Sequence, residues 1–290
     1  TTNAFLAPKT LARLAMLSRY ADIFIATGRS RFAIHDFLSH FEAAGVGITG
    51  WILEHGAVVS GQNIWTRGVL EGIDLDRVWD DIERLVQERG LPIDCRYYRP
   101  VRQATVLLSA RGAVPAEHLL DLAAGFLDGR FRTIVGRRKL ALIPMKGDKF
   151  TAFSANFGDT HTLAFAAGDQ PDDLTLLRHA AYPVTLGNAS PLVKDYVRVR
   201  GGSVAEASGH QGTGEMIDAI LNRLASGGDP LSVPGPPLPA EETDTFRPSR
   251  RAYLDLLFDR TPHPEEIPDT DLLREWSRNL QRGRGLLLEV

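Results

Sequence analysis

The sequence predicts an α/β fold, in which a doubly wound, Rossmann-like core is interrupted by an inserted α+β domain. Short apolar strands alternate with amphipathic helices in residues 1–66 and again in residues 143–226. This alternation is typical of a mostly parallel sheet with helices on both faces. Between the two segments, residues 67–142 change to a different rhythm that ends in two adjacent strands. We therefore predict one core domain built from 1–66 and 143–226, with a separate domain at 67–142.

The elements of the first core segment follow from hydrophobic periodicity. Apolar positions at helical spacing predict helices, and short apolar runs predict strands. In order, we expect a helix at Pro8–Ser18, a strand at Ile23–Ala26, a helix at Phe32–Ala44, and strands at Trp51–Leu53 and Ala57–Val59.

The inserted block and the second core segment are predicted in the same way. In the block we expect a helix at Leu75–Glu88, a strand at Ala104–Leu108, a helix at Pro115–Leu127, and paired strands at Arg132–Val135 and Lys139–Ile143. The second core segment is expected to hold a helix near Phe150, a strand at Leu163–Ala167, a short helix from Leu174, a strand at Tyr182–Leu186 and a helix at Gly214–Leu224.

Residues 227–290 differ in composition from the rest of the chain. Five prolines fall within residues 227–241, which is typical of a linker. Two amphipathic helices are expected beyond it, at Arg251–Arg260 and Asp271–Arg282. If the protein forms a homo-oligomer, we expect this helical extension to carry the contact.

Composition limits the classes of function. The chain has 290 residues, of which 43% are hydrophobic, and a formal net charge of −3. This charge gives no basis for binding nucleic acid or a membrane surface through bulk electrostatics. The single cysteine, Cys95, excludes an internal disulfide framework and favours a reducing, cytoplasmic compartment. No apolar run approaches the ~20 residues of a membrane span.

The turn after the strand Leu163–Ala167 is the most informative segment. It carries three carboxylates, Asp169, Asp172 and Asp173, within five residues. Acidic side chains so close together repel one another unless a cation lies between them, and hard oxygen ligands suit Mg²⁺. Ligands of doubly wound sheets bind just beyond the carboxyl ends of the strands, where this turn lies. The alternative is a solvated acidic turn in which Asp172 caps the following helix.

Two further polar segments occupy comparable positions. The strand Ile23–Ala26 ends in the turn Thr27-Gly28-Arg29-Ser30, and Lys149 opens a helix after a polar turn. A helix start disfavours a cation, so Lys149 is better explained by function than by helix stability. Lys146 is the competing lysine in the same turn.

Together these features resemble the haloacid dehalogenase (HAD) superfamily of phosphohydrolases. The segments ATGRS, LEHGAVV, IPMKGDKFTAF, GDQPDD and TLGNA follow the order and spacing of that family's motifs over roughly residues 5–225. In particular, the chain is similar to the branch with an α/β cap inserted after the second motif. That branch includes the trehalose-, sucrose- and mannosylglycerate-phosphate phosphatases, so the resemblance implies Mg²⁺-dependent hydrolysis of a small phosphorylated substrate.

The resemblance also implies roles for individual residues. Thr27 would hold an oxygen of the transferring phosphoryl group, and Lys149 would neutralise the nucleophile and the phosphate. Asp169 would bind Mg²⁺ directly, while Asp173 would bind it through water or orient Lys149. Asp172 stands where the family commonly has Asn, and it would support the metal site.

The substrate would lie against the turns around these residues. The implied substrate-binding residues are Gly28, Arg29, Ser30, His55 and Asn188. For His55 a structural hydrogen bond is an alternative, and for Gly187-Asn188 a plain turn after a strand. Basic and aromatic residues of the cap could grip an anionic or sugar substrate or form a solvated edge; these are Arg96, Tyr97, Tyr98, Arg99 and Arg102.

The family's nucleophile is missing from the sequence. It is the first aspartate of an Asp-x-Asp-Gly-Thr motif on the central strand, and this motif would end just before Thr1. We expect that the aspartate lies upstream of Thr1, because loss of a central strand would leave two sheet edges and core side chains uncovered. The alternatives are a non-catalytic binding or scaffold protein that lacks the nucleophile, and a phosphosugar mutase of the same fold.

Overall fold

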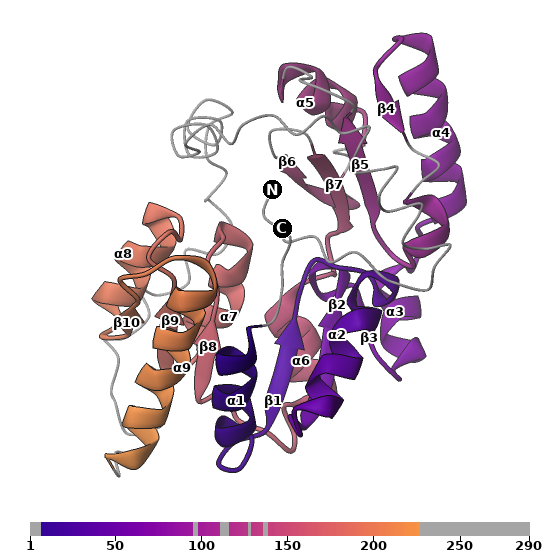
Figure 1. Ribbon diagram of the computed structural model, residues 1–290. Helices are drawn as coiled ribbons and strands as arrows, with labels where there is room; N and C mark the ends of the chain where they lie inside the picture. Colours follow the sequence, from indigo (N-terminus) through magenta and orange to yellow (C-terminus); the bar gives the residue numbers. More distant parts are fainter. Residues whose placement is uncertain (1–6, 95–97, 111–115, 127–128, 136–138, 227–290) are drawn as a thin grey trace.

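The computed structural model describes residues 7–94, 98–110, 116–126, 129–135 and 139–226, and Figure 1 shows their arrangement. The predicted linker and helices of residues 227–290 lie outside the described residues, as do Cys95, Arg96 and Tyr97. None of the described helices is both long enough and apolar enough to cross a membrane.

The first core segment forms a three-stranded sheet with three helices. Its elements are α1 (Pro8–Leu17), β1 (Ile23–Ala26), α2 (Arg31–Ala43), β2 (Ile48–Leu53), the 3-10 turn η1 (Glu54–Gly56), β3 (Val58–Val59) and α3 (Asn63–Val69). The order in the sheet is β1-β2-β3, with β1 parallel to β2 and β3 antiparallel to β2.

The second core segment forms a parallel three-stranded sheet in the order β10-β9-β8. Its elements are α6 (Lys149–Phe157), β8 (Phe165–Ala167), η3 (Pro171–Asp173), α7 (Leu174–His179), β9 (Tyr182–Thr185), α8 (Pro191–Val199), β10 (Ser203–Val204) and α9 (Gly209–Ala225). The carboxyl end of β8 therefore leads directly into the acidic turn.

The inserted domain is an antiparallel sheet backed by two helices. Its elements are α4 (Leu75–Glu88), β4 (Ile93–Asp94), η2 (Arg99–Val101), β5 (Val106–Ala110), α5 (Ala116–Ala124), β6 (Phe131–Val135) and β7 (Lys139–Pro144). The strand order is β4-β5-β7-β6. One hydrophobic cluster joins α4 and α5 to this sheet and includes Trp79, Leu108 and Leu142. In Figure 1 this domain lies above the strand ends of the core.

Strand β1 shows why the core is doubly wound. Ile23 and Ile25 pack with α1, α2 and α9, whereas Phe24 and Ala26 pack with α6 on the opposite face. Successive side chains of a strand point to opposite faces, so both faces of β1 carry an apolar layer. Helices α1 and α9 lie side by side on one face (Figure 1).

The two core sheets share hydrophobic clusters but no strand pairing. Ile25 of β1 and Phe165 of β8 contribute to the same cluster, and Ala26 packs against the cluster of Ala166. Among the described residues, β1 and β8 are each hydrogen-bonded to a neighbour on one side only. Within the described ranges the core therefore consists of two half-sheets, and their inner edges, β1 and β8, pair with no further described strand.

Most predicted elements are confirmed, with ends displaced by a few residues. The periodicity missed the short elements α3, β4, α8 and β10, and it placed the start of α9 five residues late, at Gly214 instead of Gly209. Helix α3 crosses the predicted domain boundary at residue 66 and packs against β3 of the core. The boundaries of the two domains stay predictions.

Candidate active site

The acidic turn is held by a buried lysine. The Lys149 side chain, at the first position of α6, is 7% exposed, and its Nζ lies 2.5 Å from Oδ1 of Asp173 and 3.0 Å from Oδ2 of Asp172. Burial alone lowers the pKa of this ammonium, but the charges of Asp173 and Asp172 outweigh it and the pKa is raised. Lys149 is therefore charged, and the third of its N–H donors is not used by these two contacts.

Both carboxylate oxygens of Asp173 are occupied by contacts within the turn and with Lys149. Its Oδ1 accepts from Lys149, and its Oδ2 accepts from the backbone N–H groups of Asp169 at 2.9 Å and Gln170 at 3.0 Å. A carboxylate with both oxygens occupied in this way fixes the turn and Lys149. This geometry suits the orienting role among the two alternatives for Asp173.

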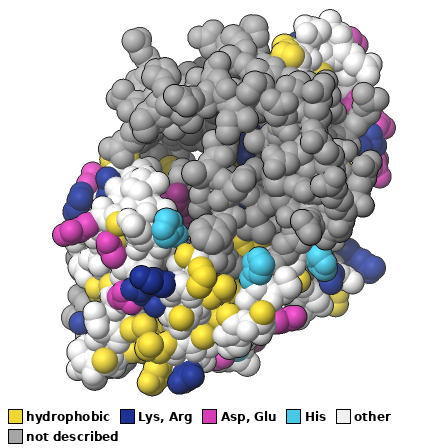
Figure 2. All heavy atoms as spheres, viewed as in Figure 1, with side chains coloured by type: hydrophobic (Ala, Val, Ile, Leu, Met, Phe, Trp, Pro, Cys, Tyr) yellow, Lys and Arg dark blue, Asp and Glu magenta, His cyan; other side chains and the backbone are white. Residues whose placement is uncertain are grey.

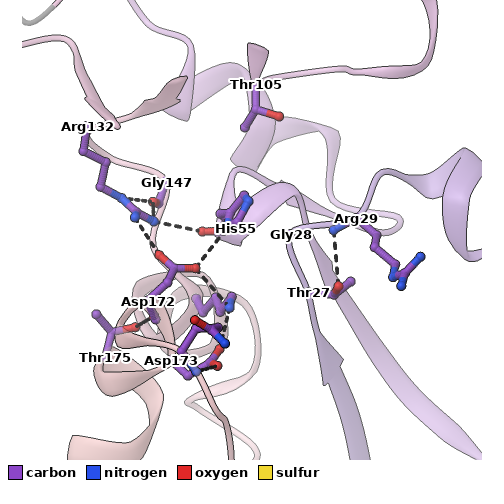
Figure 3. A network of polar contacts seen from close by, with 12 residues as sticks. Thr27, Gly28, Arg29, His55, Thr105, Arg132, Gly147, Asp172, Asp173 and Thr175 are labelled. Atoms are coloured by element: carbon purple, nitrogen blue, oxygen red, sulfur yellow. Dashed lines mark hydrogen bonds and ion pairs between the residues drawn. The ribbon is translucent and has the colours of Figure 1, made fainter. Parts of the chain in front are cut away.

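Asp172 makes three side-chain contacts, all of them with basic residues. Its Oδ2 lies 2.9 Å from Nδ1 of His55 and 3.0 Å from Lys149, and its Oδ1 accepts from Arg132 at 2.6 Å (Figure 3). Burial opposes ionisation, but the hydrogen bond from His55 and the charges of Lys149 and Arg132 hold the pKa of Asp172 well below its usual value. Asp172 is not a helix cap, because its side chain points to these groups.

Asp169 differs from its two neighbours. Its Oδ2 accepts from Nε2 of Gln170 at 2.9 Å, and no other side chain among the described residues forms a hydrogen bond or ion pair with this carboxylate. Burial and the nearby charge of Asp173 raise the pKa of Asp169. A half-buried carboxylate without an ion-pair partner among the described residues is a fitting ligand for Mg²⁺, which takes one or two protein carboxylates and keeps several waters.

The three aspartates do not form one ligand cluster. No group of three or more His, Cys, Asp or Glu side chains within the described part of the chain is arranged to hold a metal ion. The reason is local, since Asp172 and Asp173 turn their oxygens to cations and backbone amides. Asp169 alone offers an open oxygen atom.

The Thr27–Ser30 turn is held mainly by backbone contacts. The N–H of Thr27 bonds Ile52, the carbonyl of Thr27 accepts from His55, and Oγ1 of Thr27 accepts from the N–H of Arg29 at 3.2 Å. Ser30 is buried and caps α2 by accepting from the N–H of Ala33 at 3.4 Å.

The Arg29 side chain leaves this turn in the opposite direction to the acidic residues. In Figure 3 it points away from Asp172. Its guanidinium lies 5.5 Å from the ring centre of Phe37 in α2. Gly28 therefore lies against His55, whereas Ser30 caps α2 and the Arg29 guanidinium lies over a ring of the same helix.

His55 bridges the two turns from a strained position. Glu54 and His55 have φ angles of 50° and 60°, which are uncommon for residues with a side chain. The His55 ring lies so close to Gly28 that a Cβ built there would be 2.4 Å from Cε1 and Nε2. Burial lowers the pKa of His55 despite Asp172, so the ring is neutral. Because the Asp172 carboxylate only accepts, Nδ1 of His55 carries the proton.

Three side chains tie the inserted domain to this region, and the sequence patterns indicated none of these contacts. Glu54 is 1% exposed, and its carboxylate accepts from the N–H groups of Gln103, Ala104 and Thr105 and from Oγ1 of Thr105 at 2.8 to 3.1 Å. Arg102 donates to the carbonyl of Gly28 at 2.7 Å. The third side chain is Arg132, which donates to Asp172 and to the carbonyl of Gly147.

Of the other basic candidates in the inserted domain, Arg99 pairs with Asp80 and Asp76 of α4, on the domain's own surface.

The turn after β9 lies beside the acidic turn. The N–H of Ser190 bonds the carbonyl of Asp169 at 3.0 Å, and Oγ1 of Thr185 bonds the carbonyl of Gly168 at 2.6 Å. Asn188, between them, is exposed. A Cβ on Gly187 would meet three backbone carbonyl oxygens, so only glycine fits there. Asn188 is thus placed near Asp169, and its predicted contact with a substrate stays a prediction.

Comparison with solved structures identifies the fold. The sucrose-phosphatase from Synechocystis sp. PCC6803, solved in complex with sucrose and phosphate, aligns with 78% of this chain and 94% of its own, with a TM-score of 0.56 and 16% identity. The chain has a haloacid dehalogenase-like fold. A HAD-like hydrolase from Bacteroides thetaiotaomicron aligns with 73% of this chain and 91% of its own, with a TM-score of 0.55 and 16% identity.

A HAD subclass IIB sugar phosphatase shows the same likeness. It aligns with 76% of this chain and 93% of its own, with a TM-score of 0.52 and 17% identity. No family model and no curated protein sequence matches the chain. At these identities the comparisons establish the HAD-like fold, which confirms the predicted α/β class, and the activity has to be argued from the site.

Proposed function

We propose that this protein is a Mg²⁺-dependent phosphohydrolase that acts on a phosphate monoester of the phosphorylated-sugar class. The observation that carries the proposal is the buried, charged Lys149 at the carboxyl ends of the strands, next to Asp169 and joined through Asp172 and His55 to the Thr27–Gly28 turn. The sugar-phosphate class rests on the structural neighbours named as sucrose-phosphatase and sugar phosphatase.

Each residue has a definite part in such a reaction. Phosphoryl transfer is catalysed chiefly by positioning and by charge stabilisation. Lys149 uses two donors to stay in place, which leaves the third for a phosphate oxygen or for the nucleophile. The Thr27 hydroxyl, already oriented by its bond from the N–H of Arg29, donates its own proton to a second phosphate oxygen.

The cation fits at Asp169. Bound there, Mg²⁺ would act as a Lewis acid that polarises a phosphoryl oxygen. Asp173 keeps the backbone of Asp169 and Gln170 in place through its two amide contacts, and so fixes the direction of the Asp169 carboxylate. In this proposal the phosphate would lie between Asp169, Lys149 and Thr27.

The nucleophile belongs between the half-sheets. Among the described residues β1 and β8 each pair with a strand on one side only, and a parallel strand placed between them would end between Thr27 and Asp169. We propose that a strand preceding Thr1 occupies this interval and supplies an aspartate. Its carboxylate attacks phosphorus and displaces the alcohol of the ester, whose oxygen takes up a proton; water then hydrolyses the aspartyl-phosphate, which releases inorganic phosphate and regenerates the aspartate. This strand would also pair the two free edges.

A phosphate-release screen over sugar phosphates, with and without Mg²⁺, tests the proposal on the complete gene product. Activity that requires Mg²⁺ and disappears in the Lys149→Met variant supports it. A gene without an upstream Asp-x-Asp, together with no release from any phosphate ester, would favour the non-catalytic scaffold. Isomerised product without released phosphate would favour a mutase.

A further inference from the structure

Arg132 of the inserted domain makes an unusual set of contacts with the core. From β6 its guanidinium donates to Oδ1 of Asp172 at 2.6 Å and to the carbonyl of Gly147 at 3.0 Å. A longer contact of 3.5 Å reaches the carbonyl of His55. Figure 3 shows the side chain pointing from its strand into the space between these three groups. All three acceptors belong to turns of the core, so one residue of the inserted domain binds three core segments.

The charges around the acidic turn explain why a cation is needed there. Within the core, the three negative charges of Asp169, Asp172 and Asp173 are balanced only by the single positive charge of Lys149. The Asp172 side chain is 9% exposed and that of Arg132 is 28% exposed, so water screens their attraction only in part. Two negative charges are left unbalanced by Lys149, and the guanidinium of Arg132 balances one of them.

Arg132 also decides where Asp172 points. A carboxylate three residues from Asp169 could turn its second oxygen toward a cation bound at Asp169. Arg132 holds that oxygen, Oδ1, while His55 and Lys149 hold the other. The planar fork of arginine can bind Asp172 and the carbonyl of Gly147 at once, which the single ammonium of a lysine cannot do with the same geometry.

We propose that Arg132 is a positioning residue that the inserted domain supplies to the cation site. It keeps Asp172 turned to Lys149 and His55, and it leaves Asp169 as the carboxylate open to the divalent cation. The inference rests on the proposed function for the identity of the cation. Removing Arg132 then has a distinctive consequence: Asp172 is released toward the site and divalent cations bind more tightly.

The test is a double-mutant cycle with Mg²⁺ alone as the probe, in the full chain. Calorimetric titration of R132M should give about tenfold tighter Mg²⁺ binding than the unsubstituted protein, since one positive charge is lost and one ligand gained. In the D172N background the same substitution should tighten binding only about twofold, because no carboxylate is released. Equal shifts in both backgrounds would overturn the proposal.

Two further variants separate positioning from a general loss of structure. R132K keeps the charge without the fork and should lie between the unsubstituted protein and R132M. R84M removes an exposed arginine of α4 that pairs with Asp81, and should leave Mg²⁺ binding unchanged. If R84M tightened binding as much as R132M, a remote effect of net charge would replace the proposed one.

Urea unfolding of the four proteins of the cycle (unsubstituted, R132M, D172N and the double variant) distinguishes this inference from the proposed function. R132M should lower the unfolding midpoint by about 0.3–0.5 M in the unsubstituted background and by much less in the D172N background. That coupling without any Mg²⁺ binding would contradict the proposed function and leave the link between Arg132 and Asp172 standing. If the protein bound Mg²⁺ but R132M and D172N changed the unfolding midpoint additively, the link between Arg132 and Asp172 would be contradicted and the proposed function would stand.

Discussion

The turns that follow β1 and β8 occupy equivalent positions at the ends of two parallel strands, yet they are held in different ways. The Thr27–Ser30 turn is fixed by backbone hydrogen bonds and a helix cap. The Gly168–Asp173 turn is fixed by charge, through Lys149, Arg132 and a hydrogen bond from His55. Substitutions in the first turn should therefore change stability through steric clashes, whereas substitutions in the second turn should change stability and activity by leaving charges unpaired.

Lys149→Met should have the largest effect, because it leaves Asp172 and Asp173 buried without their shared cation. We expect a loss of about 3–5 kcal/mol in the free energy of unfolding and at least a 10²- to 10³-fold loss of any phosphatase turnover. Denaturant titration and phosphate release measure the two effects.

Lys146→Met is the matched control for this substitution. Lys146 lies three residues away, is 59% exposed and pairs with the exposed Glu71. Its loss should be mild in both assays. If Lys146→Met were the more damaging variant, the assignment of the lysine in this turn would be wrong.

Asp169→Asn separates function from stability within the charged turn. The raised pKa of Asp169 means that its carboxylate opposes folding at pH values above the unfolded pKa, so a neutral amide of the same shape should leave the melting temperature equal or higher. Mg²⁺ affinity, measured by calorimetry, should fall at least tenfold by comparison with the exposed control Asp159→Asn. Unchanged Mg²⁺ binding and turnover would remove Asp169 from the site.

Gly28→Ala tests the turn that is held by steric fit. The added Cβ would meet the His55 ring at 2.4 Å, so the ring has to move and its bond to Asp172 weakens. We expect a loss of about 1–3 kcal/mol in unfolding free energy. Gly47→Ala is a matched control, since nothing lies within 4 Å of a Cβ there. Equal effects of the two substitutions would mean that the close approach of His55 is unimportant.

The smallest expected effect is the contribution of His55, which connects the two turns, to the pH dependence of stability. His55 faces Asp172, Lys149 and Arg132, and burial lowers its pKa in the folded protein. The unfolded chain then takes up a proton that the folded chain does not, so stability falls as pH drops below about 6.5, by at most about 1.4 kcal/mol per pH unit. His55→Asn, which tolerates positive φ, should lack this increment in denaturant titrations between pH 7 and 5. An identical pH profile in both proteins would contradict it.

Local patterns were sufficient to predict most elements of the fold. The apolar runs at Ile23–Ala26 and Tyr182–Leu186 indicated strands because a buried strand needs continuous apolar residues. Helix α3 and strand β10 escaped prediction because they are short and their stability comes from packing. Arg132 escaped because nothing in an alternating strand shows what lies opposite its side chain.

The sequence by itself predicted that three carboxylates and a threonine turn lie at the carboxyl ends of strands, where doubly wound sheets bind ligands, and the resemblance to the HAD superfamily added the lysine. Only the tertiary structure decided what each carboxylate does. Asp173 turns to backbone amides, Asp172 to residues 23 to 117 positions away in the chain, and Asp169 alone keeps an open oxygen. The division depends on which partners folding brings within hydrogen-bond distance, and that is not encoded in the spacing of the aspartates.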